Sequence, residues 1–120
     1  MYKSIITVLL VFCGVLWSLS MNAQNEKTLT GEVLDLSCYL TNGAKGPGHA
    51  ACAKACLKNG HPMGLLTDEG DVYLLTFNKS DDAPFQALKE LGGEMVKIKG
   101  TQSDRDGMSL VVVMEAEKKE

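Results

Sequence analysis

Three cysteines and both histidines of the chain fall within one stretch, from Asp35 to Gly64. Thiolates and imidazoles are the donors that zinc and copper select in proteins, and three cysteines with one histidine form a known tetrahedral zinc set. The stretch therefore predicts a site for zinc or copper. Its ligands would be Cys38, His49, Cys52 and Cys56, with His61 and Met63 either as further donors or as fillers of a turn and the core.

The spacing of these residues fits a short helix that presents them on one face. Residues 49–57 are rich in alanine and are followed by Asn-Gly and Pro, which favours a helix that ends soon afterwards. At about 100° per residue, His49, Cys52 and Cys56 point within about 60° of one another. Cys52 and Cys56 are one turn apart and can chelate one ion. His49 is about 10 Å of helix rise from Cys56, so it must fold back from the helix start, and Cys38 must reach the helix from the first strand.

Two other interpretations of the cysteines stay open. A disulfide from Cys38 to Cys52 or to Cys56 would close a loop of about 15–19 residues, for about 3 kcal/mol, and the domain would then be a binding module without a cofactor. Alternatively, His49 could activate Cys52 at the helix start for thiol redox chemistry. The chain lacks a C-x-x-C redox pair, and an enzyme is the less favoured interpretation. Asp35 would either orient a metal ligand or cap a loop amide.

The rest of the chain predicts the elements that position this stretch. Strand-forming or alternating residues indicate five strands, at residues 28–36, 63–67, 71–77, 94–100 and 108–114. A second helix is predicted between the third and fourth strands, where Pro84 suits a first turn. This is the element order of an OB-fold barrel. We therefore expect a mainly β, five-stranded OB-like barrel, with the Cys/His loop-helix at 37–62 inserted between the first two strands.

The same stretch resembles part of a known group of proteins. Residues 35–39 (DLSCY), 49–56 (HAACAKAC) and 60–66 (GHPMGLL) are similar to the D-x-x-C-Y, H-x-x-C-x-x-x-C and G-x-P-x-G-L-L segments of a set of small exported bacterial proteins with an OB-like fold. The resemblance covers most of residues 30–115. Because the function of that set is uncharacterised, the resemblance implies export and fold and implies no activity.

The first residues predict export. Lys3 precedes the uncharged apolar run 5–17, and small or polar residues lead to Ala23, a pattern typical of a signal peptide. Cleavage of residues 1–23 would leave 24–120 as one domain, periplasmic or secreted; retention as a membrane anchor is the alternative. Cleavage also removes Cys13, so the exported domain keeps three cysteines. An odd number implies a free thiol, an intermolecular bridge or thiolates protected by a metal.

Charge and composition limit the classes of binding partner that are expected for the exported domain. Without Lys3, the domain has 11 basic and 15 acidic residues, a net charge of about −4. No basic face is expected, and Trp17 belongs to the leader, so the aromatic platform of a nucleic-acid-binding OB-fold is missing. The charged residues 115–120 predict a solvated tail. The expected partner is a metal ion or another protein, with no nucleic acid and no membrane insertion after cleavage.

Overall fold

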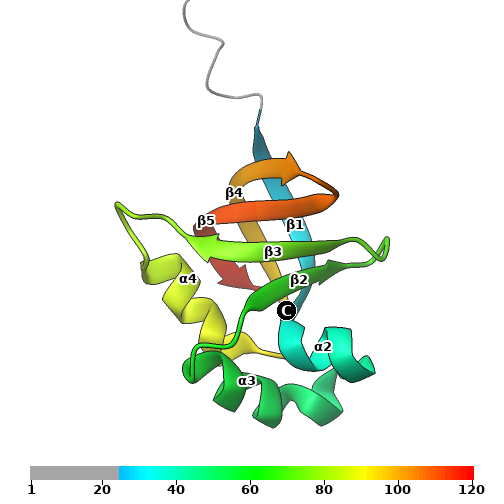
Figure 1. Cartoon of the computed structure of the whole chain (residues 1–120). Helices are drawn as coiled ribbons and strands as arrows, with labels where there is room; N and C mark the ends of the chain where they lie inside the picture. The colour runs from blue at the N-terminus through cyan, green and yellow to red at the C-terminus, as the bar shows by residue number, and fades with distance from the viewer. Residues whose placement is uncertain (1–24) are drawn as a thin grey trace, which may run out of the picture.

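The computed structural model describes residues 25–120, and the predicted leader at 1–23 lies outside them. Five strands form a closed barrel in the order β1-β2-β3-β5-β4 (Figure 1). β3 and β5 run parallel and the other neighbours antiparallel. The predicted five-stranded OB-like barrel is confirmed. Its strands are β1 (Glu26–Asp35), β2 (Met63–Thr67), β3 (Val72–Phe77), β4 (Met95–Arg105) and β5 (Met108–Lys118).

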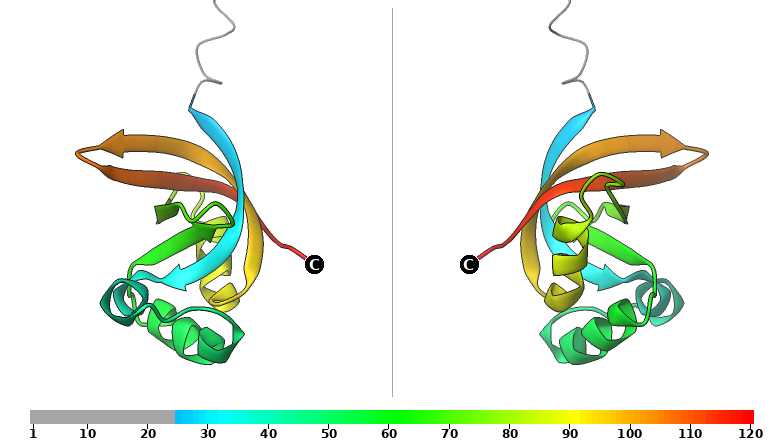
Figure 2. Two further views of the ribbon diagram at one scale, coloured as in Figure 1. Left: turned by 90° about the vertical axis from the view of Figure 1, so that its right-hand side faces the viewer. Right: turned by 90° about the vertical axis from the view of Figure 1, so that its left-hand side faces the viewer.

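Short helices occupy the two connections where the sequence places them. α2 (Leu36–Asn42), η2 (Pro47–His49) and α3 (Ala50–Lys58) lie between β1 and β2, whereas α4 (Ala83–Leu88) and η3 (Lys89–Leu91) lie between β3 and β4. α2 and α3 lie next to each other at one end of the barrel (Figures 1 and 2). No helix in residues 25–120 is long and apolar enough to cross a membrane.

The core fills the barrel and continues into the helices at its end. Leu57 of α3 and Leu88 of α4 are fully buried and join the strand residues. Met63 is only 1% exposed and belongs to this core, so its thioether fills space inside the barrel. The other strand members of the cluster are Val33, Leu65, Leu75, Val96, Ile98, Val111 and Val113.

β4 and β5 are longer than the sequence predicts. They form a hairpin around Asp106 and Gly107, both with positive φ (52° and 82°), and this hairpin extends well beyond the barrel (Figure 2). At its other end, β5 continues to Lys118, which pairs with Val96. The charged residues of 115–120 are exposed, as predicted, but 115–118 belong to a strand and do not form a tail. The alternating charges there are the exposed side of a strand whose other side packs on the barrel.

Two glycines let the connection before β4 lie directly against α3. A Cβ atom on Gly93 would sit 2.7 Å from the Ala50 Cα, and a Cβ atom on Gly92 would sit 3.0 Å from the Lys54 backbone nitrogen. Gly93 also has a φ of +79°, which side chains rarely adopt. Its N–H donates to the Val33 carbonyl oxygen at 2.7 Å. This close approach fixes where α3 sits on the barrel.

Gly93→Ala is therefore expected to destabilise the domain by about 2 kcal/mol or more, because it combines backbone strain with a collision against helix backbone. Chemical denaturation followed by circular dichroism measures the change. Gly70→Ala is the matched control, since Gly70 also has a positive φ (+89°) but has open space around its Cα. A similar loss in both variants would show that strain acts alone and that the approach to α3 contributes nothing.

Glu94 joins α3 to the end of β5. Its carboxylate contacts the Lys118 Nζ at 2.8 Å and the Lys54 Nζ at 3.1 Å. Hydrogen bonds from Lys118 and then from Lys54 hold the pKa of Glu94 below its ordinary value, and the same contact raises the pKa of Lys118. These two ion pairs are partly solvated, so water and salt screen their contribution to the stability of the fold.

A carboxylate with a lowered pKa in the folded state stabilises the fold above its unfolded pKa, and that contribution is lost as the pH falls. Glu94→Gln should therefore unfold slightly more easily than the wild type at pH 7, and the difference should vanish between about pH 5 and pH 3. Melting temperatures measured across this range test the prediction. Glu69→Gln, in the exposed turn before β3, is the control. A difference for Glu94→Gln that persists at pH 3 would contradict it.

Candidate metal centre

Asp35 lies where the chain leaves the barrel and enters the inserted helices. It is the last residue of β1, paired in register with Met63, and it is also the N-cap of α2. Its Oδ1 accepts a hydrogen bond from the Ser37 N–H at 2.9 Å, as capping residues commonly do. The predicted role as a cap is confirmed. The side chain is nevertheless fully buried, which a surface cap does not require.

The turn into α2 is built by packing as well as by the cap. The Leu36 N–H donates to the Pro62 carbonyl oxygen at 3.0 Å, which brings the start and end of the insertion together. The Leu36 side chain covers Gly64, where a Cβ atom would lie 2.6 Å from the Leu36 Cδ2. α2 then ends at Gly43, whose φ is +74°. Cys38 is thereby placed in the first turn of a helix that the sequence did not predict.

Five side chains form two overlapping groups of metal donors around Asp35. In the first group, donor atoms of Asp35, Cys38 and His49 all lie within 4.8 Å of one another. In the second, donor atoms of Asp35, Cys56 and His61 satisfy the same limit. The His61 Nδ1 is 3.4 Å from the Asp35 Oδ2. The structure thus contains an Asp/Cys/His arrangement that can hold a metal ion.

Two buried atoms in this cluster have no hydrogen-bond partner. They are the Asp35 Oδ2 and the His49 Nε2; the 3.4 Å approach of His61 to the former does not have hydrogen-bond geometry. Buried polar atoms are nearly always paired, because leaving one unpaired costs about 1–3 kcal/mol. Both residues belong to the first donor group. A cation between them would satisfy both atoms.

The carboxylate controls the protonation of the thiols around it. The Asp35 carboxylate beside it, followed by burial and other nearby negative charge, raises the pKa of the Cys38 thiol to about 11. Burial, followed by the same carboxylate, raises the pKa of Cys56. Burial acts to raise the pKa of Asp35, but the adjacent Cys38 and Cys56 thiols and the Cys38 and Ser37 backbone N–H groups together outweigh it and hold that pKa below its usual value. At neutral pH the cluster is one carboxylate beside protonated thiols.

The structure brings together most of the predicted ligands, but the donor groups share Asp35 and do not centre on the two cysteines of α3. Cys38, His49, Cys56 and His61 each belong to a donor group, whereas Cys52 is exposed and belongs to neither. Asp35, expected to orient a ligand or cap a loop amide, does act as a cap and in addition is common to both donor groups. The signal for it in the sequence was a carboxylate three residues before Cys38 at the end of a strand.

The thiols are unpaired in this structure. Cys38, Cys52 and Cys56 are all free, so neither of the disulfides considered above, from Cys38 to Cys52 or from Cys38 to Cys56, is formed. Cys52 and Cys56 are one turn apart on α3, where Cβ atoms are about 5–6 Å apart and too distant for an unstrained disulfide. The reduced cysteines leave all three sulfur atoms available as donors.

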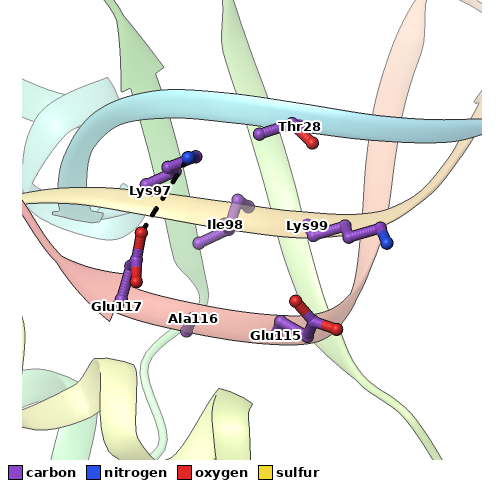
Figure 3. A pocket seen from close by; sticks show the side chains of 7 residues that line it. All are labelled: Thr28, Lys97, Ile98, Lys99, Glu115, Ala116 and Glu117. Atoms are coloured by element: carbon purple, nitrogen blue, oxygen red, sulfur yellow. Dashed lines mark ion pairs between the residues drawn. The ribbon is translucent and has the colours of Figure 1, made fainter.

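A hollow on the outer surface of the barrel differs in character from the donor cluster at Asp35. It measures about 310 Å³ and is lined by residues of β1, β4 and β5 (Figure 3). Lys97 faces Glu117 and Lys99 faces Glu115 across the two strands. The Lys97–Glu117 pair measures 4.0 Å, and Lys99 contacts Glu26 at 3.0 Å. These charges are paired with one another at the solvated surface, so the donor cluster at Asp35 is the stronger candidate site.

Comparison with known proteins finds no matching family model, no match among the curated proteins and no match among the solved structures. Function must therefore be inferred from the side chains themselves.

Proposed function

We propose that this protein is an exported zinc-binding accessory protein, which holds one ion between the barrel end and its inserted helices. Asp35, Cys38 and His49 are the core ligands, and Cys56, which belongs to the second group around the same carboxylate, completes the set. The observation that carries the proposal is the pair of buried, unpartnered atoms, Asp35 Oδ2 and His49 Nε2, which belong to two residues of one donor group.

Charge supports a cation at this position. Deprotonating the two thiols beside the Asp35 carboxylate would gather three negative charges in a partly buried site, and the raised pKa values of Cys38 and Cys56 reflect that cost. A divalent ion displaces the thiol protons and offsets the repulsion. The same raised pKa values argue against Cys38 and Cys56 as reactive thiols, because reactive cysteines need a lowered pKa.

The donor types favour zinc over copper. Both groups contain one carboxylate, one thiol and one imidazole. Zinc accepts all three in tetrahedral sites, whereas Cu(I) selects thiolate and thioether. Met63, the thioether that would have favoured copper, is enclosed in the barrel core. The leader-like residues 1–23 and the resemblance of the 35–66 stretch to exported proteins support a role outside the cytoplasm, where the protein would store zinc or deliver it to a partner protein.

Native mass spectrometry of protein purified from its export compartment tests the proposal. We expect one zinc ion per chain, its loss with a chelator, and the release of at least one proton per ion bound at pH 7, since the Cys38 thiol must deprotonate. Cobalt substitution should give the absorption bands of a tetrahedral, thiolate-bound ion. A mass two hydrogens lower, with one titratable thiol and no bound metal, would instead establish the disulfide module.

A further inference from the structure

Cys52 has an unusual position for a residue that is not a ligand. It lies on α3 one turn after His49 and one turn before Cys56, so its Cβ is about 5–6 Å from the Cβ of each. His49 belongs to the first donor group and Cys56 to the second. Cys52 is thus the helix neighbour of a ligand in both groups.

Exposure separates Cys52 from the donors beside it. Cys52 is exposed, whereas Cys38, His49 and Cys56 are partly buried and Asp35 is fully buried. A molecule in solution can therefore reach the Cys52 sulfur without displacing any side chain of the cluster. The unpartnered Asp35 Oδ2 and His49 Nε2 belong to residues of the first donor group. Among these residues, exposure thus increases from the Asp35 carboxylate to the Cys52 thiol.

We propose that Cys52 is the exchange ligand through which zinc passes between the buried donors and a thiolate acceptor in solution, such as a cysteine-bearing partner protein. This inference rests on the proposed zinc site. Buried ligands alone would hold the ion where an acceptor cannot approach it. A thiolate at the rim can bond to zinc while a buried donor still holds it, because zinc accepts a transient fifth ligand.

The exchange involves no electron transfer. The Cys52 thiol releases a proton to solvent and its sulfur bonds to zinc as one buried zinc–sulfur bond breaks, and that buried thiolate takes up a proton. Two thiolates of the acceptor and two water molecules then bond to zinc as the Cys52 sulfur, the second buried thiolate, the Asp35 carboxylate and the His49 imidazole leave, and both released protein thiolates are reprotonated. Zinc stays Zn²⁺ throughout, and each zinc–ligand bond that breaks is replaced by one that forms.

Transfer kinetics test this role. The full chain, loaded with zinc, is mixed with the dithiol dimercaptosuccinate, and the loss of zinc is followed over time. We expect Cys52→Ser to slow the transfer about tenfold or more, while the equilibrium zinc affinity changes less than about threefold. Ala51→Ser is the matched control, because Ala51 is exposed on the same helix turn and points about 100° away. It should leave both quantities unchanged.

Each other outcome is decisive. An unchanged transfer rate in Cys52→Ser would make Cys52 a bystander, and an affinity lower by about tenfold or more would make it a resident ligand; either result overturns the inference while leaving the zinc site in place. Cys56→Ser, measured alongside, should lose affinity. If the wild type binds no zinc, the proposed function fails and the exchange role fails with it. The wild-type titration separates that case from the other two.

Discussion

Asp35→Asn is expected to lower the zinc affinity more than about 100-fold while the fold remains intact. Loss of a residue that only supports a ligand typically costs about 10–100-fold in metal affinity, and Asp35 belongs to both donor groups. Asparagine is as good a helix N-cap as aspartate, so the hydrogen bond from the Ser37 N–H can be retained. The substitution thus removes the charge and keeps the cap.

Competition against a chromophoric zinc chelator measures the affinity, and thermal melting without metal measures the fold. Asp81→Asn is the matched control, because the Asp81 Oδ1 also accepts a hydrogen bond from the N–H two residues later, at 3.1 Å, but on an exposed surface. It should bind zinc like the wild type. Wild-type affinity in Asp35→Asn would show that the carboxylate is not a ligand and would remove the basis for the site.

Leu57→Ala is expected to destabilise the domain by about 2–5 kcal/mol. Leu57 is 0% exposed and is the residue of α3 that enters the main core cluster. Alanine would leave a cavity between the barrel and the helix that carries Cys52 and Cys56. Small shifts of the helix and the barrel would close this cavity only in part. The loss should appear as a lower midpoint of urea denaturation in the metal-free protein.

Leu40→Ala provides the comparison, since Leu40 is 74% exposed on α2 and its truncation should change stability by less than about 0.5 kcal/mol. Zinc should restore part of the stability lost in Leu57→Ala, because an ion that binds only the folded state stabilises it by about 2.7 kcal/mol at 100 times its dissociation constant. Stability unaffected by zinc in both the wild type and Leu57→Ala would argue against a site that includes α3.

The barrel could be predicted from the sequence because a local pattern indicates each strand, either alternating apolar and polar residues or a run of strand-forming residues. α2 could not. It has only seven residues, too few to show a helical period, and it follows β1 with no intervening loop. Its helix depends on the Asp35 cap and on the Leu36 side chain packing over Gly64, and that second contact joins residues far apart in the chain.

The metal ligands could be predicted only in part, again because local sequence patterns do not show how elements far apart in the chain pack together. The helical period correctly placed Cys52 and Cys56 near one another, but it does not say which part of that face meets the barrel. Ala53 and Leu57 are the buried residues of α3. Cys56 lies about 80° and Cys52 about 120° from the middle of that buried stripe, so Cys56 is partly covered and Cys52 is exposed. The burial of the Asp35 side chain makes it a candidate ligand as well as a cap. This burial depends on the tertiary structure, and the neighbouring residues in the sequence do not indicate it.

The insertion leaves the barrel at Asp35 and returns at Met63, and these two residues are paired with each other. Local opening of the inserted helices therefore need not shift the register of any strand. Local opening of this kind costs less free energy than unfolding the whole domain. The backbone amides of α2 and α3 should then exchange with solvent through such openings, and a bound ion would suppress them. Metal binding and local opening of the inserted helices are thus thermodynamically coupled. The strands of the barrel do not take part in this coupling.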